Sequence, residues 1–220
     1  IIMITEGICL KYILYRGMRT IFSPIFRILF RPRIIGAQNI PQDGAAVIAG
    51  NHKHALDPIL IDISTKRVVR TLAKKELHDG RFGFIFRGVG TIPVDLHAAS
   101  NHSALESAIN ALNDGELVNV SPEAKRNYTN ELLLPFKFGA AAMSARTGAK
   151  IVPYAITGEY KVFSRHRVTV IFGKPIQAQG DITAATKQLY SSVAGLLRRT
   201  MPQEELAQKH FTSYDDWSKK

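Results

Sequence analysis

Cysteine, long apolar runs and acidic residues are all scarce in this sequence. The only cysteine is Cys9, so no disulfide bond can form within the chain, which is compatible with a reducing compartment. No stretch reaches the ~18 uncharged apolar residues of a membrane span, so we expect no transmembrane helix. Acidic residues number 18 against 29 basic ones, and the net charge is +11. This excess favours acidic partners: nucleic acid, anionic membranes, phosphorylated substrates or an acidic carrier protein.

Motifs of several common enzyme classes are also absent. No G-x-S-x-G occurs, so the sequence offers no nucleophile elbow. No G-x-x-x-x-G-K-[ST] phosphate loop occurs either. His52, His54 and Asp57 approach the H-x-H-x-D-H pattern of metallo-β-lactamase-type hydrolases, but Leu56 occupies the aspartate position and no histidine follows Asp57. We therefore expect no metal site, and the sequence indicates no other cofactor.

Residues 1–32 differ from the rest of the chain in composition. Over residues 1–33, six basic residues accompany a single acid, Glu6, within a broad apolar surface. Such a pattern is typical of a helix lying in a membrane interface, although a helix packed on the domain core would also carry apolar bulk. Ser23 and Pro24 predict a break and a second helix start, and Pro32 limits that second helix. We interpret residues 1–32 as a basic, apolar helical membrane anchor.

From residue 33 to residue 220 the pattern is that of an α/β domain. Apolar, often β-branched segments alternate with amphipathic ones, and no internal repeat or long linker divides them. This order predicts one mixed, largely parallel sheet flanked by helices. The expected strands are residues 33–35, 45–49, 68–73, 91–94, 116–120, 151–157 and 167–172. The expected helices are residues 58–65, 76–87, 103–115 (opened by a capping box at Ser103), 136–147, 182–199 and a short one after Pro202.

The stretch from residue 46 to residue 58 is the first candidate site. A buried strand ends at Gly50, a polar turn follows, and Asp57 with Pro58 predicts a helix N-cap and first helical position. His52 should therefore lie just past the carboxyl end of a strand, where open α/β sheets bind ligands.

Histidine and aspartate across a turn are suited to general-base chemistry. Imidazole titrates near pH ~6.5, and a carboxylate on its other ring nitrogen would fix the tautomer, as in a serine-type triad. Because no serine nucleophile is indicated, the simplest inference is that His52 activates a hydroxyl of the substrate. From the residues alone, the alternative stays open that Asp57 merely caps a helix and His52 satisfies a turn.

Residues 121–126 (SPEAKR) form the second candidate site. They follow an expected strand and place an acid and two bases in a proline-containing turn. Arg126 is suited to a bidentate grip on phosphate, Lys125 would add charge, and Glu123 would orient them or a hydroxyl. A solvated charged loop is the alternative interpretation.

Five motifs, in order, resemble those of the glycerolipid acyltransferase family, and in particular the bacterial 1-acylglycerol-3-phosphate acyltransferases. Together they cover the chain from about residue 33 to residue 175. They are residues 51–57 (NHKHALD, similar to NHx4D), 90–95 (GTIPVD), 121–126 (SPEAKR, similar to FPEGTR), 133–139 (LLPFKFG) and 151–156 (IVPYAI).

The resemblance implies a glycerol-3-phosphate acyltransferase-like fold and a defined reaction. His52 would deprotonate the sn-2 hydroxyl of a lysophosphatidic acid, Asp57 would orient His52, and the alkoxide would attack the thioester of an acyl carrier protein or coenzyme A donor. The product would be phosphatidic acid, made for phospholipid synthesis. Within the third motif, Glu123 and Arg126 would hold the glycerol phosphate, with Lys125 and Pro122 beside them.

Departures from the family pattern leave alternatives open. In the third motif Ser121 replaces phenylalanine, Ala124 replaces glycine and Lys125 replaces threonine, while Leu96 stands where the second motif usually has an arginine. Alanine adopts positive φ less freely than glycine, so we expect a different turn at residue 124. The acceptor is then either lysophosphatidic acid or another lysolipid or amino-lipid. A catalytically inactive lipid-binding homologue is the remaining alternative.

The resemblance and the charge together predict the partners. We expect the bilayer, a lysophospholipid acceptor and an acyl donor, with the protein bound peripherally or monotopically at the cytoplasmic face of the cell membrane. Nucleic acid is not an expected partner, because no strand interleaves aromatic and basic residues as RNA-binding sheets do.

Overall fold

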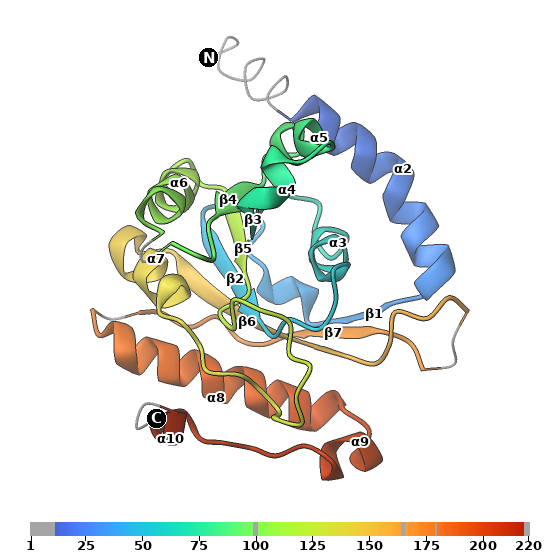
Figure 1. Cartoon of the computed structure of the whole chain (residues 1–220), viewed down its shortest axis with the longest axis vertical. Helices are drawn as coiled ribbons and strands as arrows, with labels where there is room; N and C mark the ends of the chain where they lie inside the picture. The colour runs from blue at the N-terminus through green and yellow to red at the C-terminus, as the bar shows by residue number, and fades with distance from the viewer. Residues whose placement is uncertain (1–11, 99–100, 164–165, 179, 218–220) are drawn as a thin grey trace.

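A seven-stranded sheet organises the molecule (Figure 1). The computed structural model describes residues 12–98, 101–163, 166–178 and 180–217. The strand order is β1-β7-β6-β2-β5-β3-β4, and β6 and β7 form the antiparallel pair among otherwise parallel neighbours. The predicted mixed, largely parallel sheet is therefore confirmed. The strands are β1 (Arg33–Ile35), β2 (Ala46–Gly50), β3 (Val69–Lys74), β4 (Ile92–Val94), β5 (Leu117–Val120), β6 (Lys150–Thr157) and β7 (Thr169–Phe172).

Helices cover both faces of the sheet. In Figure 1, α6, α7 and α8 lie on one face, while α3 lies on the other with α2 outside it. The long helices are α2 (Ile13–Phe30), α6 (His102–Asn113), α7 (Gly139–Thr147) and α8 (Ile182–Thr200). The short ones are η1 (Ala37–Asn39), α3 (Asp57–Asp62), α4 (Lys75–Asp79), α5 (Gly83–Gly88), α9 (Gln203–Ala207) and α10 (Tyr214–Trp217).

Strand β2 shows why the central strands read as continuous apolar runs. Val47 and Ala49 belong to the apolar cluster under α6, α7 and α8, whereas Ala46 and Ile48 belong to the cluster under α2 and α3. Successive side chains of a strand point to opposite faces, and both faces here are covered. Every residue of β2 is accordingly buried.

Helix α2 differs from its prediction, because it runs through Pro24 without a break. Tyr15 and Phe26, one on each side of the proline, are both buried against the domain. Arg27 Nη2 also donates to the carbonyl of Ile63 at 2.6 Å. These contacts offset the ~3 kcal/mol that an interior proline costs. The predicted stop before Pro32 is confirmed, since the helix ends with Arg31 in the left-handed conformation.

The N-terminal segment is described from Tyr12 onward, so its first residues lie outside the described part of the chain. Within the described residues, no helix is both long enough and apolar enough to cross a bilayer. Helix α2 instead packs one face on the domain and leaves an apolar face exposed.

Three predicted helices have different bounds for local reasons. The helix expected at residues 76–87 is divided into α4 and α5 around Gly80 and Gly83. Helix α6 begins one residue before Ser103, so the predicted capping box does not form, and the side chain of Asn101 accepts from the Asp95 N–H instead. Helix α7 begins at Gly139 rather than at residue 136, because the Lys137 N–H donates to the Pro122 carbonyl at 2.9 Å.

Candidate active site

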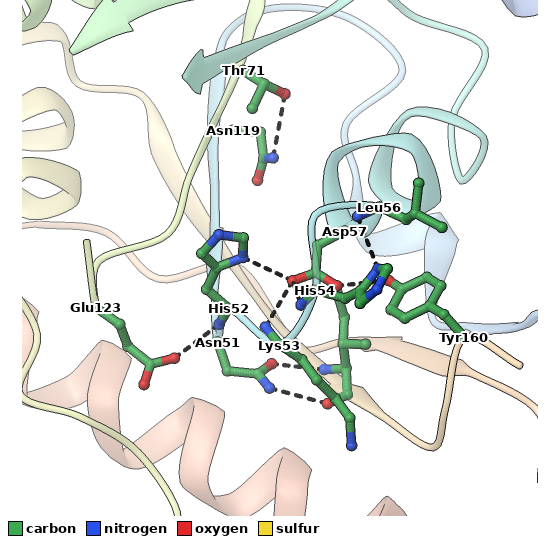
Figure 2. A network of polar contacts seen from close by, with 11 residues as sticks. Asn51, His52, Lys53, His54, Leu56, Asp57, Thr71, Asn119, Glu123 and Tyr160 are labelled. Carbon is green, nitrogen blue, oxygen red and sulfur yellow. Dashed lines mark hydrogen bonds and ion pairs between the residues drawn. The ribbon is translucent and has the colours of Figure 1, made fainter. Parts of the chain in front are cut away.

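His52 and Asp57 form a close pair at the carboxyl edge of the sheet (Figure 2). Strand β2 ends at Gly50, and the turn that follows carries His52 toward Asp57, the first residue of α3. The distance from His52 Nδ1 to Asp57 Oδ2 is 2.8 Å. The Asp57 side chain is 2% exposed and that of His52 is 25% exposed. Because Nδ1 is hydrogen-bonded to the carboxylate, Nε2 is the ring nitrogen that can take a proton from a substrate.

The Asp57 carboxylate accepts hydrogen bonds from the preceding turn and from a residue that is distant in the sequence. Its Oδ2 accepts from the main-chain N–H groups of Lys53 (2.7 Å) and His54 (2.8 Å). Its Oδ1 accepts from the Tyr160 hydroxyl at 2.7 Å. The prediction that Asp57 caps α3 is wrong, because no side chain caps this helix. These donors stabilise the buried carboxylate and hold it in the orientation that His52 needs.

The two residues before His52 fix the direction of the turn. Gly50 lies so close to Tyr154 of β6 that a Cβ would be 2.2 Å from the Tyr154 carbonyl oxygen. Asn51 then extends the β2–β6 pairing with its side chain, since its Nδ2 donates to the Ile156 carbonyl (3.0 Å) and its Oδ1 accepts from the Ile156 N–H (2.7 Å). Only a side-chain amide offers a donor and an acceptor in this arrangement.

Glu123 lies beside His52 but contacts its main chain. One carboxylate oxygen accepts from the His52 N–H and the other from the Leu134 N–H, both at 2.8 Å. The residue is 4% exposed, and burial raises the pKa of its carboxyl to about 7, although these two N–H groups oppose the rise. In this structure Glu123 therefore ties the β5–α7 loop to the turn that carries His52. Its predicted contact with the acceptor stays a prediction.

The remaining residues of the third motif point in different directions. Pro122 is buried, whereas Lys125 and Arg126 are exposed. The Arg126 guanidinium lies 5.4 Å from the centre of the Tyr128 ring. The next residue, Asn127, donates its N–H to the His52 carbonyl at 3.1 Å. The loop that carries Lys125 and Arg126 therefore lies next to the His52–Asp57 pair, which we call the dyad. Ala124 adopts φ 57°, in the left-handed region that glycine favours, and the predicted difference of this turn from the family pattern stays a prediction.

Sequence reasoning missed Tyr160, which is 103 residues from Asp57 along the chain. The feature of the sequence that could have identified it is its position just after a strand. Tyr160 follows β6 by three residues, and β6 runs parallel to and pairs with β2, the strand that leads to His52. Residues just past neighbouring parallel strands meet at one edge of a sheet.

Comparisons with known proteins point to one family. The family model described as Acyltransferase matches residues 31–157. A 1-acyl-sn-glycerol-3-phosphate acyltransferase of Borreliella burgdorferi is 27% identical over 135 residues, which is 60% of this chain and 54% of that protein. One of Helicobacter pylori is 28% identical over 137 residues, which is 61% of this chain and 54% of that protein. The match thus spans about half the length of these curated relatives.

A solved structure is similar over more of the chain. The 1-acyl-sn-glycerophosphate acyltransferase PlsC of Thermotoga maritima matches with a TM-score of 0.67 and 23% identity, covering 84% of this chain and 79% of that one. This likeness shows the fold. Because the family model spans more than half of the sequence and contains His52, Asp57, Glu123 and Arg126, the chain belongs to the acyltransferase family.

Proposed function

We propose that this protein is an O-acyltransferase that moves a fatty acyl group from a thioester to the sn-2 hydroxyl of lysophosphatidic acid, giving phosphatidic acid. The observation that carries the proposal is the His52–Asp57 pair, with its 2.8 Å contact, its buried carboxylate and its partly exposed imidazole. The names of the two curated relatives support the choice of acceptor.

The reaction needs one base that later serves as an acid. His52 Nε2 takes the proton of the acceptor hydroxyl as its oxygen attacks the thioester carbonyl. Asp57 stabilises the imidazolium that forms and keeps Nδ1 protonated. The tetrahedral intermediate then collapses, the carbon–sulfur bond breaks, and the imidazolium returns the proton to the thiolate. An ester and a free thiol result, and no metal or other cofactor enters the scheme.

The exposed bases of the third motif are our proposed phosphate site. Arg126 presents a planar, permanently charged fork that matches a phosphate monoester, and Lys125 adds a second charge. Their loop is tied to His52 through the Asn127 N–H, which supports a phosphate bound within reach of the dyad. A different lysolipid or an amino-lipid acceptor would use the same dyad. The intact hydrogen bonds around Asp57 favour catalysis over the inactive alternative.

The donor is either an acyl carrier protein or coenzyme A. Both present a thioester and carry negative charge, and the basic surface of this chain attracts both.

We further propose that α2 docks the enzyme on the cytoplasmic face of the cell membrane, peripherally or monotopically. Its outer face leaves Ile21 61% exposed and Ile28 64% exposed, and Phe22 lies beside them. Two further exposed phenylalanines lie next to α2. Phe84 belongs to α5, which packs against α2, and the Phe163 N–H donates to the Leu29 carbonyl. An apolar surface of this kind is suited to the acyl boundary of a bilayer.

The decisive experiment is a mass-spectrometric assay of the purified protein with a panel of lysolipids and with both donors. We expect His52→Ala to lower kcat by about 10²–10⁴-fold, which is the usual contribution of a general base. Arg126→Gln should raise the acceptor KM more than it lowers kcat, because Arg126 binds a group remote from the reacting carbonyl.

Exposed residues away from the site supply the controls. His102→Ala and Arg81→Gln remove the same side-chain types there and should leave both constants unchanged. An unchanged rate in His52→Ala would refute the proposed chemistry. Wild-type protein that acylates no lipid in the panel would instead favour an inactive lipid-binding homologue.

A further inference from the structure

Tyr160 is a partly buried tyrosine whose hydroxyl contacts the His52–Asp57 dyad from outside the motifs. It lies in the connection that follows β6, beyond the end of the family match at residue 157. Its hydroxyl donates to Asp57 Oδ1 at 2.7 Å, while Oδ2 of the same carboxylate faces His52. Figure 2 shows Tyr160 and His52 on opposite sides of Asp57. Burial and the neighbouring Asp57 both raise the pKa of Tyr160, so it remains a donor throughout the neutral range.

The Tyr160 ring is fixed on two sides. One face stacks on the His54 imidazole, with ring centres 4.7 Å apart and planes inclined by 23°. Its edges meet Phe26 at 6.3 Å and Phe30 at 6.0 Å, in T-shaped contacts. Both phenylalanines belong to α2. Tyr160 therefore lies between the catalytic turn and the helix that we propose to dock on the membrane.

We propose that Tyr160 is a positioning residue of the His52–Asp57 dyad, and that it makes the geometry of the dyad depend on how α2 is seated. The inference rests on the proposed function, since it assigns a role within that site. Tyr160 does not reach the reacting atoms itself, because Asp57 stands between it and His52. It acts by holding Oδ1, which fixes the rotation of the carboxylate and so directs Oδ2 at His52 Nδ1.

The two oxygens of the Asp57 carboxylate differ in their donors, and this difference explains why the hydrogen bond from the Tyr160 hydroxyl matters. Oδ2 has three donors, which are the His52 ring and the N–H groups of Lys53 and His54. Tyr160 is the donor that the structure gives Oδ1. Without it, the carboxylate gains freedom to rotate toward another donor and its alignment with His52 loosens. Binding of the acceptor phosphate is unaffected, because Lys125 and Arg126 belong to a different loop.

The test is Tyr160→Phe, which removes the hydroxyl and keeps the stacked ring. We expect kcat to fall about tenfold with both KM values unchanged, because a hydrogen bond to a charged group is lost at the reacting centre alone. Tyr190→Phe is the control. Tyr190 is a buried tyrosine of α8, on the face of the sheet away from α2, and its hydroxyl donates to the Thr212 carbonyl at 2.7 Å, so its loss should leave kcat unchanged.

A spectroscopic measurement separates positioning from folding. In histidine-labelled protein, with the His52 and His54 imidazole resonances assigned from His52→Gln and His54→Gln, Tyr160→Phe should shift the His52 resonance. The His54 resonance should stay in place, because the aromatic ring above it remains. Displacement of both resonances would identify a merely structural role for Tyr160 and overturn the proposal. An unchanged His52 resonance would also overturn it.

The link to α2 is tested by Phe30→Leu, which removes one edge contact with the Tyr160 ring. We expect kcat to fall about threefold in the wild-type background and to show no further loss in the Tyr160→Phe background, because the two changes act through one contact. Additive losses would overturn the link. The resonance experiment requires no turnover, so failure of the acyltransferase assay and failure of the Tyr160 proposal are separate outcomes.

Discussion

At the scale of single residues, two buried carboxylates share the site and do different work. Asp57 faces the His52 imidazole, and its other donors hold it in that orientation. Glu123 faces two main-chain N–H groups, one at His52 and one at Leu134. The third motif thus has an inner part that holds the turn and an outer part, Lys125 and Arg126, that is available to a ligand.

Ala124 gives a prediction about backbone strain. Its φ of 57° places a Cβ-bearing residue in the left-handed region, which costs about 1–2 kcal/mol relative to the right-handed one. Ala124→Gly should therefore raise the free energy of unfolding by about 1 kcal/mol, after the extra entropy of the unfolded glycine is counted. Urea denaturation followed by circular dichroism measures this change.

The reverse substitution provides the control. Gly148 ends α7 at φ 73°, and a Cβ there would meet no atom within 4 Å, so Gly148→Ala adds strain without a clash. It should lower the free energy of unfolding by about 1 kcal/mol. A destabilised Ala124→Gly protein would mean that the alanine methyl group contributes packing that outweighs the strain.

At the scale of elements, α3 joins the site to α2. It has six residues, begins at Asp57 and ends at Asp62. At its far end, the Tyr15 hydroxyl of α2 donates to Asp62, and Arg19 Nε lies 4.0 Å from the same carboxylate. Tyr160 and its two phenylalanine contacts connect α2 to the other end. Contacts with α2 therefore reach α3 at both ends, directly at Asp62 and through Tyr160 at Asp57.

Asp62, which contacts α2, makes the free energy of unfolding depend on pH. Burial raises the pKa of Asp62 to about 7, well above its value of ~3.9 in an unfolded chain. Between these two values the folded protein keeps a proton that the unfolded chain releases, so the contribution of Asp62 lowers the free energy of unfolding as the pH rises toward 7. Relative to Asp62→Asn, the wild type should lose about 2 kcal/mol of unfolding free energy between pH 5 and pH 8.

Chemical denaturation across this pH range tests the expectation. Glu123, whose pKa is also raised by burial, contributes the same trend to both proteins and cancels in the comparison. Asp79→Asn removes an exposed carboxylate of α4 and should follow the wild-type profile. Parallel profiles for the wild type and Asp62→Asn would show that Asp62 is ionised at acidic pH in the folded state.

At the scale of the whole molecule, α2 lies on the side of the sheet from which α3 brings Asp57 to the candidate site. Helix α3, which begins at Asp57, covers the sheet on the face over which α2 packs (Figure 1). A lipid acceptor that keeps its acyl chain in the bilayer would therefore meet the enzyme on its α2 side.

Neighbouring substitutions on α2 test membrane docking. Ile21→Glu removes an exposed apolar side chain and adds a negative charge, so binding to vesicles containing anionic lipid should weaken about thirtyfold. Thr20→Glu adds the same charge to an exposed position outside the apolar face and should weaken binding about fivefold. Vesicle sedimentation measures both. Equal losses in the two variants would mean that the attraction is electrostatic and that α2 inserts no apolar surface.

Local sequence signals predicted much of the fold but misplaced features that depend on packing. The strands were found because their apolar runs are buried on both faces, and Gly148 correctly marked the end of α7. Pro24 and Ser103 were misread. A proline or a capping pattern is a local preference, and in this chain the packing of α2 and the bond from Asn101 to the Asp95 N–H decided otherwise.

By itself the sequence determined the pairing that short-range geometry can fix. His52 and Asp57 are five residues apart across one turn, so a strand end and a helix start are enough to bring them together. Only the tertiary structure decided what holds the pair. Glu123 is 71 residues from His52 and Tyr160 is 103 residues from Asp57, and they reach the dyad because β5 and β6 both pair in parallel with β2. A side chain supplied by a neighbouring strand leaves no spacing in the sequence, because the register of the sheet sets its position.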